Sequence, residues 1–310
     1  MSAYVTLPKQ DWVNALDAVR AKTGTSELIA SAELAGKIES ISGGDTAMED
    51  ALIAKTVVNY VNNTATAVGD YGFFNCKNLV TVDMGACKTI GVSAFSSCSK
   101  LASVNFPQAT SIDRQAFQSC AGLVNVSFPN CLTVGSQAFR YCSSLIEATF
   151  PKATSINVGA FMYCQNLTNV SFPQCSMIDT SAFTNCSKLT RAYLPACLII
   201  YDAFYNCYAL TEVSLPSCQV LYPDAFARCS SLTSISLPAC RYIAATAFQY
   251  CSNLTSIYLG SSMCDLKGSA AFTGTGIGSD KGSIFVPASY VSAYKTATNW
   301  VYFSNRIFGY

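Results

Sequence analysis

Cysteines are the residues of this chain best suited to chemistry: there are 16 among 310 residues, and there is no histidine. In the stretch AFQSCAGLVNVSFPNCLTVGSQAFRYC, residues 116–142, three cysteines follow one another at intervals of eleven residues. Thiols can act as nucleophiles, bind metal ions or form disulfides. A chain without histidine cannot form the Ser-His or Cys-His pairs that activate a nucleophile. No two cysteines are closer than ten residues, so the CxxC pairs of zinc sites are absent from the sequence.

The cysteines belong to a repeated sequence. The pattern Ala-Phe-x-x-Cys-x-x-Leu occurs nine times, with Gly72 in place of the alanine in the first copy. Its cysteine recurs with a period of about 22 residues, which is typical of repeat architectures, and only the step between Cys186 and Cys207 is one residue shorter. Further apolar residues follow the leucine, then usually a proline and, two residues later, a second cysteine. A unit of this length cannot bury a core alone, so stacked copies, which we call rungs, should form a solenoid.

Two segments of each rung have a predictable structure. The pattern Leu-x-x-Val-x-Phe, as in residues 123–128, predicts a short strand, because Val126 and Phe128 alternate with the polar Ser127. The proline that follows should end the strand. The Ala-Phe-x-x-Cys segment should form the opposite wall, as a turn of α-helix or 3₁₀-helix. Stacked strands lie about 4.8 Å apart, so the rungs predict a rod on the order of 40 Å long.

Each cysteine series should form a ladder through the core, because every rung repeats the same position. Cysteine is small, apolar and often buried. Ala109 and Ala153 replace cysteine in the second series, and alanine can contribute only packing. We therefore expect reduced, buried thiols. Disulfides between adjacent rungs are the alternative, because stacking brings Cα atoms to about 5 Å, which a disulfide allows.

Carboxylate pairs and a glycine cluster are the remaining features that could support catalysis. Glu147 and Glu212 share one strand position, but three rungs, or about 14 Å, separate them. The two carboxylates of a glycosidase lie about 5–9.5 Å apart. The cluster GTGIGSDKGS, residues 274–283, lacks the order of a phosphate-binding GxxxxGK[ST] loop. We therefore predict that the protein is not an enzyme and has no cofactor and no metal site.

The solvent-facing side of the strands is the surface most suited to binding. Most of its residues are small and polar, so we expect a flat, hydroxyl-rich face. Tyr and Arg are enriched at binding hot spots. The candidate ligand-binding residues are the large or charged exceptions, Glu147, Arg191, Tyr193, Glu212 and Tyr258. The alternative is a solvated face with scattered bulky residues. A second candidate surface, on the opposite wall, comprises Tyr141, Tyr163, Arg228 and Tyr250.

The repeats resemble the leucine-rich repeat family, in the BspA-like subclass found on bacterial surface proteins. The residues that carry the resemblance include AFARCSSLTSISLPACRYI (225–243) and AFQYCSNLTSIYL (247–259), and it covers residues 68–260. The segment GSIFVPASYVSAYKTATNW (282–300) is similar to the closing segment of many such proteins. The resemblance implies a right-handed α/β solenoid of leucine-rich repeats and a role in ligand or protein binding and adhesion.

The chain is expected to divide into four parts. They are a helical leader (1–44), an N-terminal cap strand with a degenerate rung (45–70), the leucine-rich repeats (71–260) and a C-terminal cap (261–310). Caps are needed because an open solenoid end exposes apolar surface and strand edges. In the C-terminal cap, SYVSAYKTATNW should form a helix that turns Tyr290, Tyr294 and Trp300 inward.

The leader is the part expected to mediate oligomerisation or attachment. Its segment DWVNALDAVRAKTG (11–24) places Trp12, Leu16 and Val19 on one helical face. The pattern LDAVRAKTGTSELI with ELAGKIESI resembles the leaders of tail-associated structural proteins in phages and prophages of gut bacteria. The alternative is a small helical hairpin that caps the solenoid or self-associates.

Composition narrows the class of function. Charged residues make up only 12% and the net charge is +1, without a basic block, which excludes a typical nucleic-acid-binding protein. The apolar runs are shorter than the ~18 residues that membrane insertion requires. The first residues, MSAYVTLPKQDW, lack the charged region and apolar stretch of a secretory signal.

We therefore predict a non-enzymatic recognition or adhesion module. It would belong to a phage or prophage tail and contact a bacterial cell surface through its repeats, with a protein or a cell-surface glycan as partner. Virion proteins leave the cell by lysis, so the location would be the virion, or extracellular without a signal peptide. The alternatives are a bacterial surface adhesin that binds host proteins or cells, and an intracellular, cytoplasmic interaction scaffold.

Overall fold

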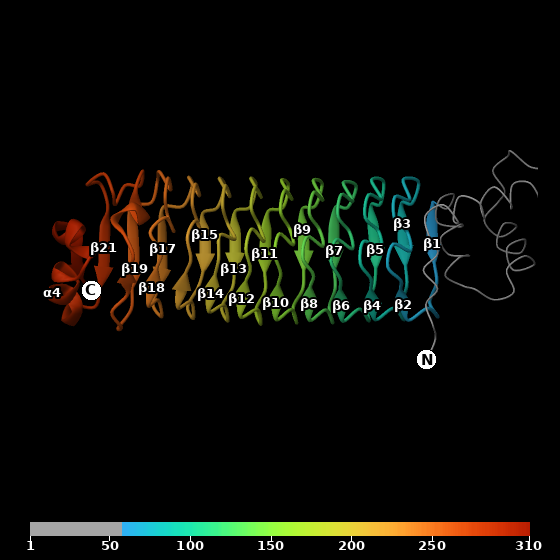
Figure 1. Cartoon of the computed structure of the whole chain (residues 1–310), viewed down its shortest axis with the longest axis horizontal. Coiled ribbons are helices and arrows are strands. Elements are labelled where there is room, and N and C mark those ends of the chain that lie inside the picture. The colour runs from blue at the N-terminus through green and yellow to red at the C-terminus, as the bar shows by residue number, and fades with distance from the viewer. Residues whose placement is uncertain (1–57) are drawn as a thin grey trace, which may run out of the picture.

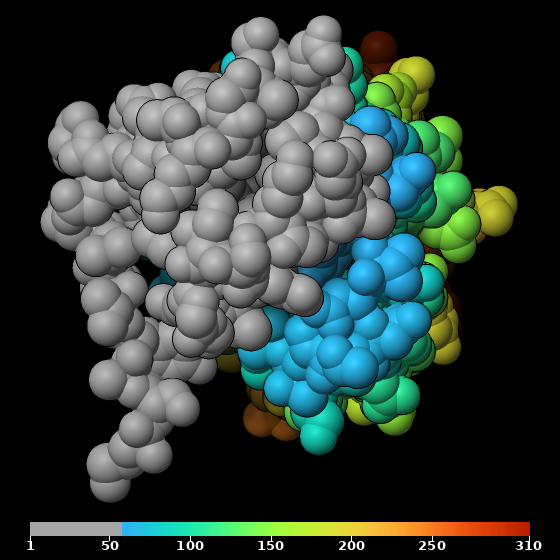
Figure 2. Space-filling view, turned by 90° about the vertical axis from the view of Figure 1, so that its right-hand side faces the viewer, coloured from blue at the N-terminus to red at the C-terminus, as the bar shows by residue number. Residues whose placement is uncertain are grey.

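Every rung of the repeat contributes two short strands to two different faces of a rod (Figure 1). The computed structural model describes residues 58–310. Within these residues the strands of each face run parallel, because each rung follows the same path as the one before it. Seen along the rod, the later rungs lie behind the first described one, shown in blue (Figure 2). The predicted parallel-strand solenoid of stacked, register-matched rungs is therefore confirmed.

The first face is built from the strand that the sequence predicts. Its members are β1 (Asn59–Val61), β3 (Thr81–Asp83), β5 (Ser103–Asn105), β7 (Asn125–Ser127), β9 (Glu147–Thr149), β11 (Asn169–Ser171), β13 (Arg191–Tyr193), β15 (Glu212–Ser214), β17 (Ser234–Leu237), β19 (Ser256–Leu259), β21 (Ser283–Val286) and β22 (Ile307–Gly309). They form three hydrogen-bonded sheets in succession: β1-β3-β5, then β7 to β15, then β17-β19-β21-β22. The hydrogen-bonding is therefore interrupted between β5 and β7 and between β15 and β17. We call this surface the sheet face.

The second face is a continuous ten-stranded sheet that the sequence pattern did not predict. Its members are β2 (Ala67–Val68), β4 (Thr89–Ile90), β6 (Ser111–Ile112), β8 (Thr133–Val134), β10 (Ser155–Ile156), β12 (Met177–Ile178), β14 (Ile199–Ile200), β16 (Val220–Leu221), β18 (Tyr242–Ile243) and β20 (Asp265–Leu266). In most rungs the strand follows the proline turn and the second cysteine position. The only sequence signal for this strand was the Ile, Val or Leu at its second position, which is buried in the structure. Two residues are too few to show the alternating pattern of a strand.

The Ala-Phe-x-x-Cys segment forms turns, so the predicted turn of α- or 3₁₀-helix is wrong. The reason is a left-handed residue before the alanine and another before the cysteine, such as Ser93 (φ 52°) and Ser97 (φ 66°). A right-handed helix cannot continue through such residues. Alternate amides bond instead to the next rung, as in Phe95 N–H to Ala116 O at 2.7 Å. This wall is thus held by bonds between rungs as well as within them.

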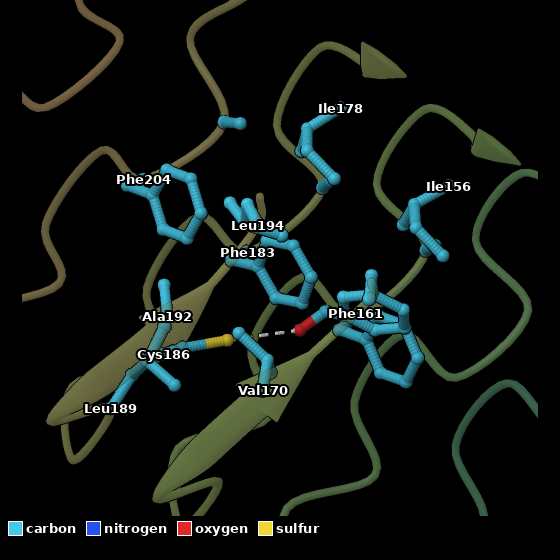
Figure 3. Packing of buried hydrophobic residues seen from close by; sticks show 14 of the residues in the cluster. Ile156, Phe161, Val170, Ile178, Phe183, Cys186, Leu189, Ala192, Leu194 and Phe204 are labelled. Carbon is cyan, nitrogen blue, oxygen red and sulfur yellow. Dashed lines mark hydrogen bonds between the residues drawn. The ribbon is translucent and has the colours of Figure 1, made fainter. Parts of the chain in front are cut away.

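Stacked phenylalanines fill the core between the faces (Figure 3). The phenylalanine of Ala-Phe-x-x-Cys lies parallel to its copy in the next rung, with ring centroids 5.1 Å apart for Phe95 and Phe117 and 5.4 Å for Phe161 and Phe183. The leucine of the pattern is fully buried, as Leu123 and Leu189 show. One repeated position thus becomes one continuous apolar column, which explains why the same residue type recurs in every copy.

All 16 cysteines are buried and unbridged, as the ladder prediction required. In the first series, from Cys98 onward, the thiol donates to a phenylalanine carbonyl of the preceding rung: Cys186 Sγ lies 3.2 Å from Phe161 O (Figure 3) and Cys142 Sγ lies 3.2 Å from Phe117 O. In the second series it donates within its own rung, as Cys131 does to Thr133 O at 3.2 Å. The first ladder therefore links rungs, whereas the second bonds locally.

The end of the chain covers the last rungs with short helices (Figure 1). They are η1 (Ser269–Phe272), η2 (Ala288–Tyr290), α4 (Val291–Thr296) and η3 (Trp300–Arg306). Trp300 packs on Phe272, with ring centroids 6.2 Å apart, and its Nε1 donates to Cys264 O at 2.7 Å. Tyr294 is fully buried, and its hydroxyl accepts from Cys264 N–H. At the other end, β1 lies within residues 45–70, where the sequence predicts the N-terminal cap strand, while the leader of residues 1–44 lies outside the described residues.

Candidate ligand-binding site on the sheet face

Alternation along the strands places the sequence-predicted site residues in solvent. In β13 the pattern is exposed, buried, exposed, so Arg191 and Tyr193 point outward while Ala192 points into the core. The same holds for β9, where Glu147 is exposed. Because rungs stack in register, Arg191 lies beside Glu212, and Tyr193 lies beside Ser214. The repeat spacing therefore places every candidate on one surface.

Arg191 and Glu212 form an ion pair across neighbouring strands. Arg191 Nε lies 3.1 Å from a carboxylate oxygen of Glu212. Both side chains are about two-thirds exposed, at 65% and 64%. An exposed pair of this kind contributes little to stability, roughly 0–1 kcal/mol. Its main effect is to hold the guanidinium and the carboxylate side by side, so that together they present a donor and an acceptor to solvent.

A shallow depression of about 560 Å³ adjoins this pair. Its lining residues are Arg191, Ala192, Tyr193, Thr211, Glu212, Val213, Ser214, Ser234, Ile235, Ser236 and Tyr258. Tyr193 and Tyr258 stand at its two ends and are 51% and 39% exposed. The small residues between them, Ser214 and Ser236, leave the space open. The sheet face is therefore hollowed here, whereas the sequence predicted it to be flat.

The depression brings together four of the five candidate residues, namely Arg191, Tyr193, Glu212 and Tyr258. Glu147 does not line it. The register runs from Glu147 through Asn169 to Arg191, so Glu147 lies two strands away from the ion pair. At about 4.8 Å per strand this is roughly 10 Å. Glu147 and Glu212 are three strands apart, as the repeat spacing predicts, and Arg191 is paired to Glu212.

An aromatic column next to the depression was missed in the sequence. Tyr258 is paired in register with Phe285, and Phe285 with Phe308. The rings of Tyr258 and Phe285 are parallel, with centroids 4.8 Å apart, and Phe308 follows at 6.3 Å. The regular repeat spacing ends after residue 260, so alignment of the repeats could not place Phe285 or Phe308 on this face. The only signal in the sequence was an aromatic residue next to an apolar one in each closing strand, Phe285 after Ile284 and Phe308 after Ile307.

The second candidate surface consists of side chains stacked on their neighbours. Tyr141 and Tyr163 are parallel with centroids 4.9 Å apart, and the guanidinium of Arg228 lies 5.2 Å from the ring centroid of Tyr250. Each of these residues has positive φ and precedes a buried cysteine. Their geometry is that of packing between rungs. Tyr141 and Tyr250 remain 40% and 48% exposed.

The thiols lie apart from this surface, and burial holds many of them in the protonated form. Cys240 is an exception, because a hydrogen bond from the Cys264 thiol lowers its pKa. Burial raises the pKa of Cys131 to about 12 and that of Cys175 to about 11, from an ordinary value of 9.0. It also raises the pKa of Cys142 and Cys186, which are among the cysteines that bond to the preceding rung. A thiol reacts as its thiolate, so these cysteines are inert at neutral pH. Among residues 58–310, no group of three or more Cys, Asp or Glu side chains could hold a metal ion.

The repeat sequences match the family model described as the BspA type leucine rich repeat region, in six copies, over residues 66–190 and 154–278. These two ranges together cover more than half of the chain. The chain belongs to the BspA-type leucine-rich repeat family. The assignment rests on the same repeated Ala-Phe-x-x-Cys-x-x-Leu units that build the rungs, and it confirms the resemblance seen in the sequence.

Several solved structures are similar to this BspA-type protein. A leucine rich cell surface protein from Faecalibacterium prausnitzii is 23% identical and has a TM-score of 0.43, covering 78% of this chain and 83% of its own. A leucine-rich repeat protein from Eubacterium ventriosum is 18% identical with a TM-score of 0.45, covering 72% and 84%. The pneumococcal vaccine antigen PcpA is 15% identical with a TM-score of 0.38, covering 82% and 79%.

The search of curated proteins finds no match. In the described part of the chain, no helix has the length and apolar character needed to span a membrane.

Proposed function

We propose that this protein is a non-enzymatic recognition and adhesion module that contacts a bacterial cell surface through its sheet face, as part of a phage or prophage tail. The observation that carries the proposal is the depression between Tyr193 and Tyr258. Elsewhere the outward strand positions of the repeats are mostly small and polar. Exposed tyrosines and an arginine around one hollow are the composition of a binding hot spot.

The chemistry of the described residues supports binding without catalysis. The chain has no histidine. Its thiols are buried, and Glu147 and Glu212 are too far apart to act on one bond. The residues around the depression offer hydrogen-bond donors, acceptors and ring faces, which are groups that hold a ligand. The BspA-type family, a family of repeat regions found on bacterial surface proteins, fits the same role.

The tail assignment is supported by the leader, whose sequence resembles leaders of tail-associated phage proteins. In this proposal residues 1–44 attach the protein or assemble it into oligomers, and the repeats read the target cell. The protein would then reach the cell exterior in the virion. A bacterial surface adhesin that binds host cells is the second candidate, and the membership of the BspA-type family favours it.

The test is the binding of labelled protein to intact cells, measured by flow cytometry. Full-length protein and residues 45–310 should each stain a narrow set of gut bacterial strains saturably, because recognition lies in the repeats. Tyr193→Ala combined with Tyr258→Ala should reduce the staining about tenfold. Tyr302→Ala is the matched control, because Tyr302 is an exposed tyrosine (66%) outside the depression.

Each other result identifies a different function. Staining of epithelial cells in place of bacteria would replace the tail protein with the adhesin. Absence of staining on both cell types would reject surface recognition and favour an intracellular scaffold. Light scattering of the two forms tests the role of the leader independently. We expect the full-length protein to be an oligomer and residues 45–310 to be a monomer.

A further inference from the structure

The two ends of the depression are aromatic rings at the same position of the repeat. Tyr193 pairs in register with Ser214, and Tyr258 pairs with Ser236. Ser214 and Ser236 occupy equivalent positions in successive rungs. Tyr193 and Tyr258 are thus three rungs apart, or about 14 Å at ~4.8 Å per rung. The space between them is wide enough for a ring of the ligand to pack against each tyrosine.

The face of each ring toward the depression is open. Phe285 covers the opposite face of Tyr258, because the two rings are stacked with an interplanar angle of 12°. The neighbour of Tyr258 on the side of the depression is only a serine. Both register neighbours of Tyr193, Ser171 and Ser214, are also serines. Among the described residues, no aromatic ring stacks on Tyr193. The tyrosines therefore offer two apolar ring faces that look along the rod.

The floor between the rings is lined by hydroxyls. Ser214, Ser234 and Ser236 line it, and no hydrogen bond joins their hydroxyls to another of the described residues. The floor also lies where the sheet of β15 ends and the sheet of β17 begins, and Val213 is only partly buried there. Hydroxyls both donate and accept hydrogen bonds, so this surface suits a partner that is itself rich in hydroxyls.

Charge around the depression is balanced. Of the residues that line it, only Arg191 and Glu212 carry charge, and they pair with each other. A strongly acidic or basic partner would meet a like charge together with an opposite one and would have to break the pair. A neutral ligand can instead bond to both groups, because guanidinium N–H groups donate and carboxylate oxygens accept. The charge therefore favours an uncharged ligand.

We propose that the depression binds a segment of a neutral polysaccharide, an inference that rests on the proposed recognition function and names its ligand class. The apolar C–H faces of a sugar ring would pack on Tyr193 and Tyr258. Its hydroxyls would bond to the serines of the floor and to the Arg191–Glu212 pair. A neutral glycan combines ring faces with peripheral hydroxyls, which matches two exposed rings above a hydroxyl-rich floor.

The experiment uses the full-length protein and named glycan probes. The probes are maltohexaose, cellohexaose, mannohexaose and chitohexaose, together with neutral polysaccharide extracted from a bacterial strain that the protein stains. Binding is measured by titration calorimetry and affinity electrophoresis. We expect at least one probe to bind, with affinity reduced about tenfold in Tyr193→Ala and in Tyr258→Ala and unchanged in Tyr302→Ala. Circular dichroism establishes that each variant is folded.

Treatment of the cells separates this inference from the function on which it rests. Periodate cleaves vicinal diols of glycans, and a protease removes surface proteins. Loss of staining after periodate, with staining retained after protease, supports a glycan ligand. Loss after protease alone, with no probe bound, overturns the glycan and leaves cell-surface recognition standing with a protein as ligand. Absence of staining on untreated cells overturns the proposed function, and binding of the hexasaccharides then decides the ligand class alone.

Discussion

At the scale of single residues, the two cysteine ladders differ in the acceptor of the thiol. From Cys98 onward, the thiols of the first ladder donate to the preceding rung, and cysteine occupies all nine copies of the pattern. The second donates two residues ahead in its own rung, and alanine replaces it at Ala109 and Ala153. Packing alone would tolerate alanine equally in both. The bond between rungs is therefore the physical difference that accompanies the stricter use of cysteine.

We predict that Cys142→Ala lowers the free energy of unfolding more than Cys131→Ala does. Both changes remove a fully buried sulfur and one S–H···O bond. The bond of Cys142 joins two rungs, whereas that of Cys131 lies within a turn that keeps its shape around Ala109 and Ala153. The expected difference is roughly that of one weak hydrogen bond, 0.5–1 kcal/mol. Urea unfolding of the two variants measures this difference. Equal losses of unfolding free energy would show that the cysteines of the first ladder contribute only packing.

At the scale of elements, the closing helices cover the apolar end of the stacked strands. The last rungs would otherwise leave Phe272 and the backbone around Cys264 exposed at the end of the rod. Trp300 covers the ring of Phe272 and binds Cys264 O, and Tyr294 packs edge-on against Trp300, with centroids 5.2 Å apart. An apolar solenoid end needs such a cover, because it would associate with other exposed surfaces.

Trp300→Ala should destabilise the protein by about 3–5 kcal/mol, as expected for the loss of a buried large aromatic side chain. The variant should also aggregate on heating before the wild-type protein does. Trp300→Phe is the matched control, because it keeps a ring against Phe272 but loses the donor to Cys264 O; an intermediate loss is expected. Circular dichroism and light scattering during a thermal ramp report both effects. Wild-type behaviour of Trp300→Ala would show that the end needs no cover.

At the scale of the whole molecule, the thiols titrate together. Burial raises the pKa of cysteines in both ladders, including Cys142 and Cys186 in the first and Cys131 and Cys175 in the second. The unfolded chain loses these protons near the ordinary value of 9.0, while the folded protein keeps them. The folded protein then holds more protons, so its stability falls as pH rises. The stabilising effect of protonated thiols is fully present below pH 9.

We predict that the protein is equally stable from pH 7 to about 8.5 and loses stability steeply between about pH 9 and 12. Each shifted thiol contributes up to about 1.4 kcal/mol per pH unit, and many act together. Chemical unfolding at a series of pH values measures the slope, and thiolate absorbance near 240 nm shows when the thiols ionise. Stability that is constant to pH 11 would mean that the thiols are already accessible to water.

Most of the fold could be predicted from the sequence repeat. Each strand position recurs once in every copy of the pattern. Because the rungs stack in register, residues at the same position of successive copies become neighbours. The outward placement of Arg191, Tyr193 and Tyr258 and the burial of the cysteines follow from that alone. The second sheet did not follow, because strands as short as Thr133–Val134 contain no alternation. The left-handed backbone conformation of residues such as Ser93 and Ser97 could not be predicted from the sequence either, because hydrogen bonds between rungs hold that conformation.

By itself, the sequence determined a solenoid with a column of buried cysteines, because a short, regular period with fixed apolar positions has few ways to bury them. Only the tertiary structure decided that the sheet face is hollow between Tyr193 and Tyr258, that Glu147 stands apart from the hollow, and that Phe285 supports one end of it. The physical reason is that a hollow depends on the sizes of side chains in several successive rungs. Where the period ends, only the folded chain places residues beside one another.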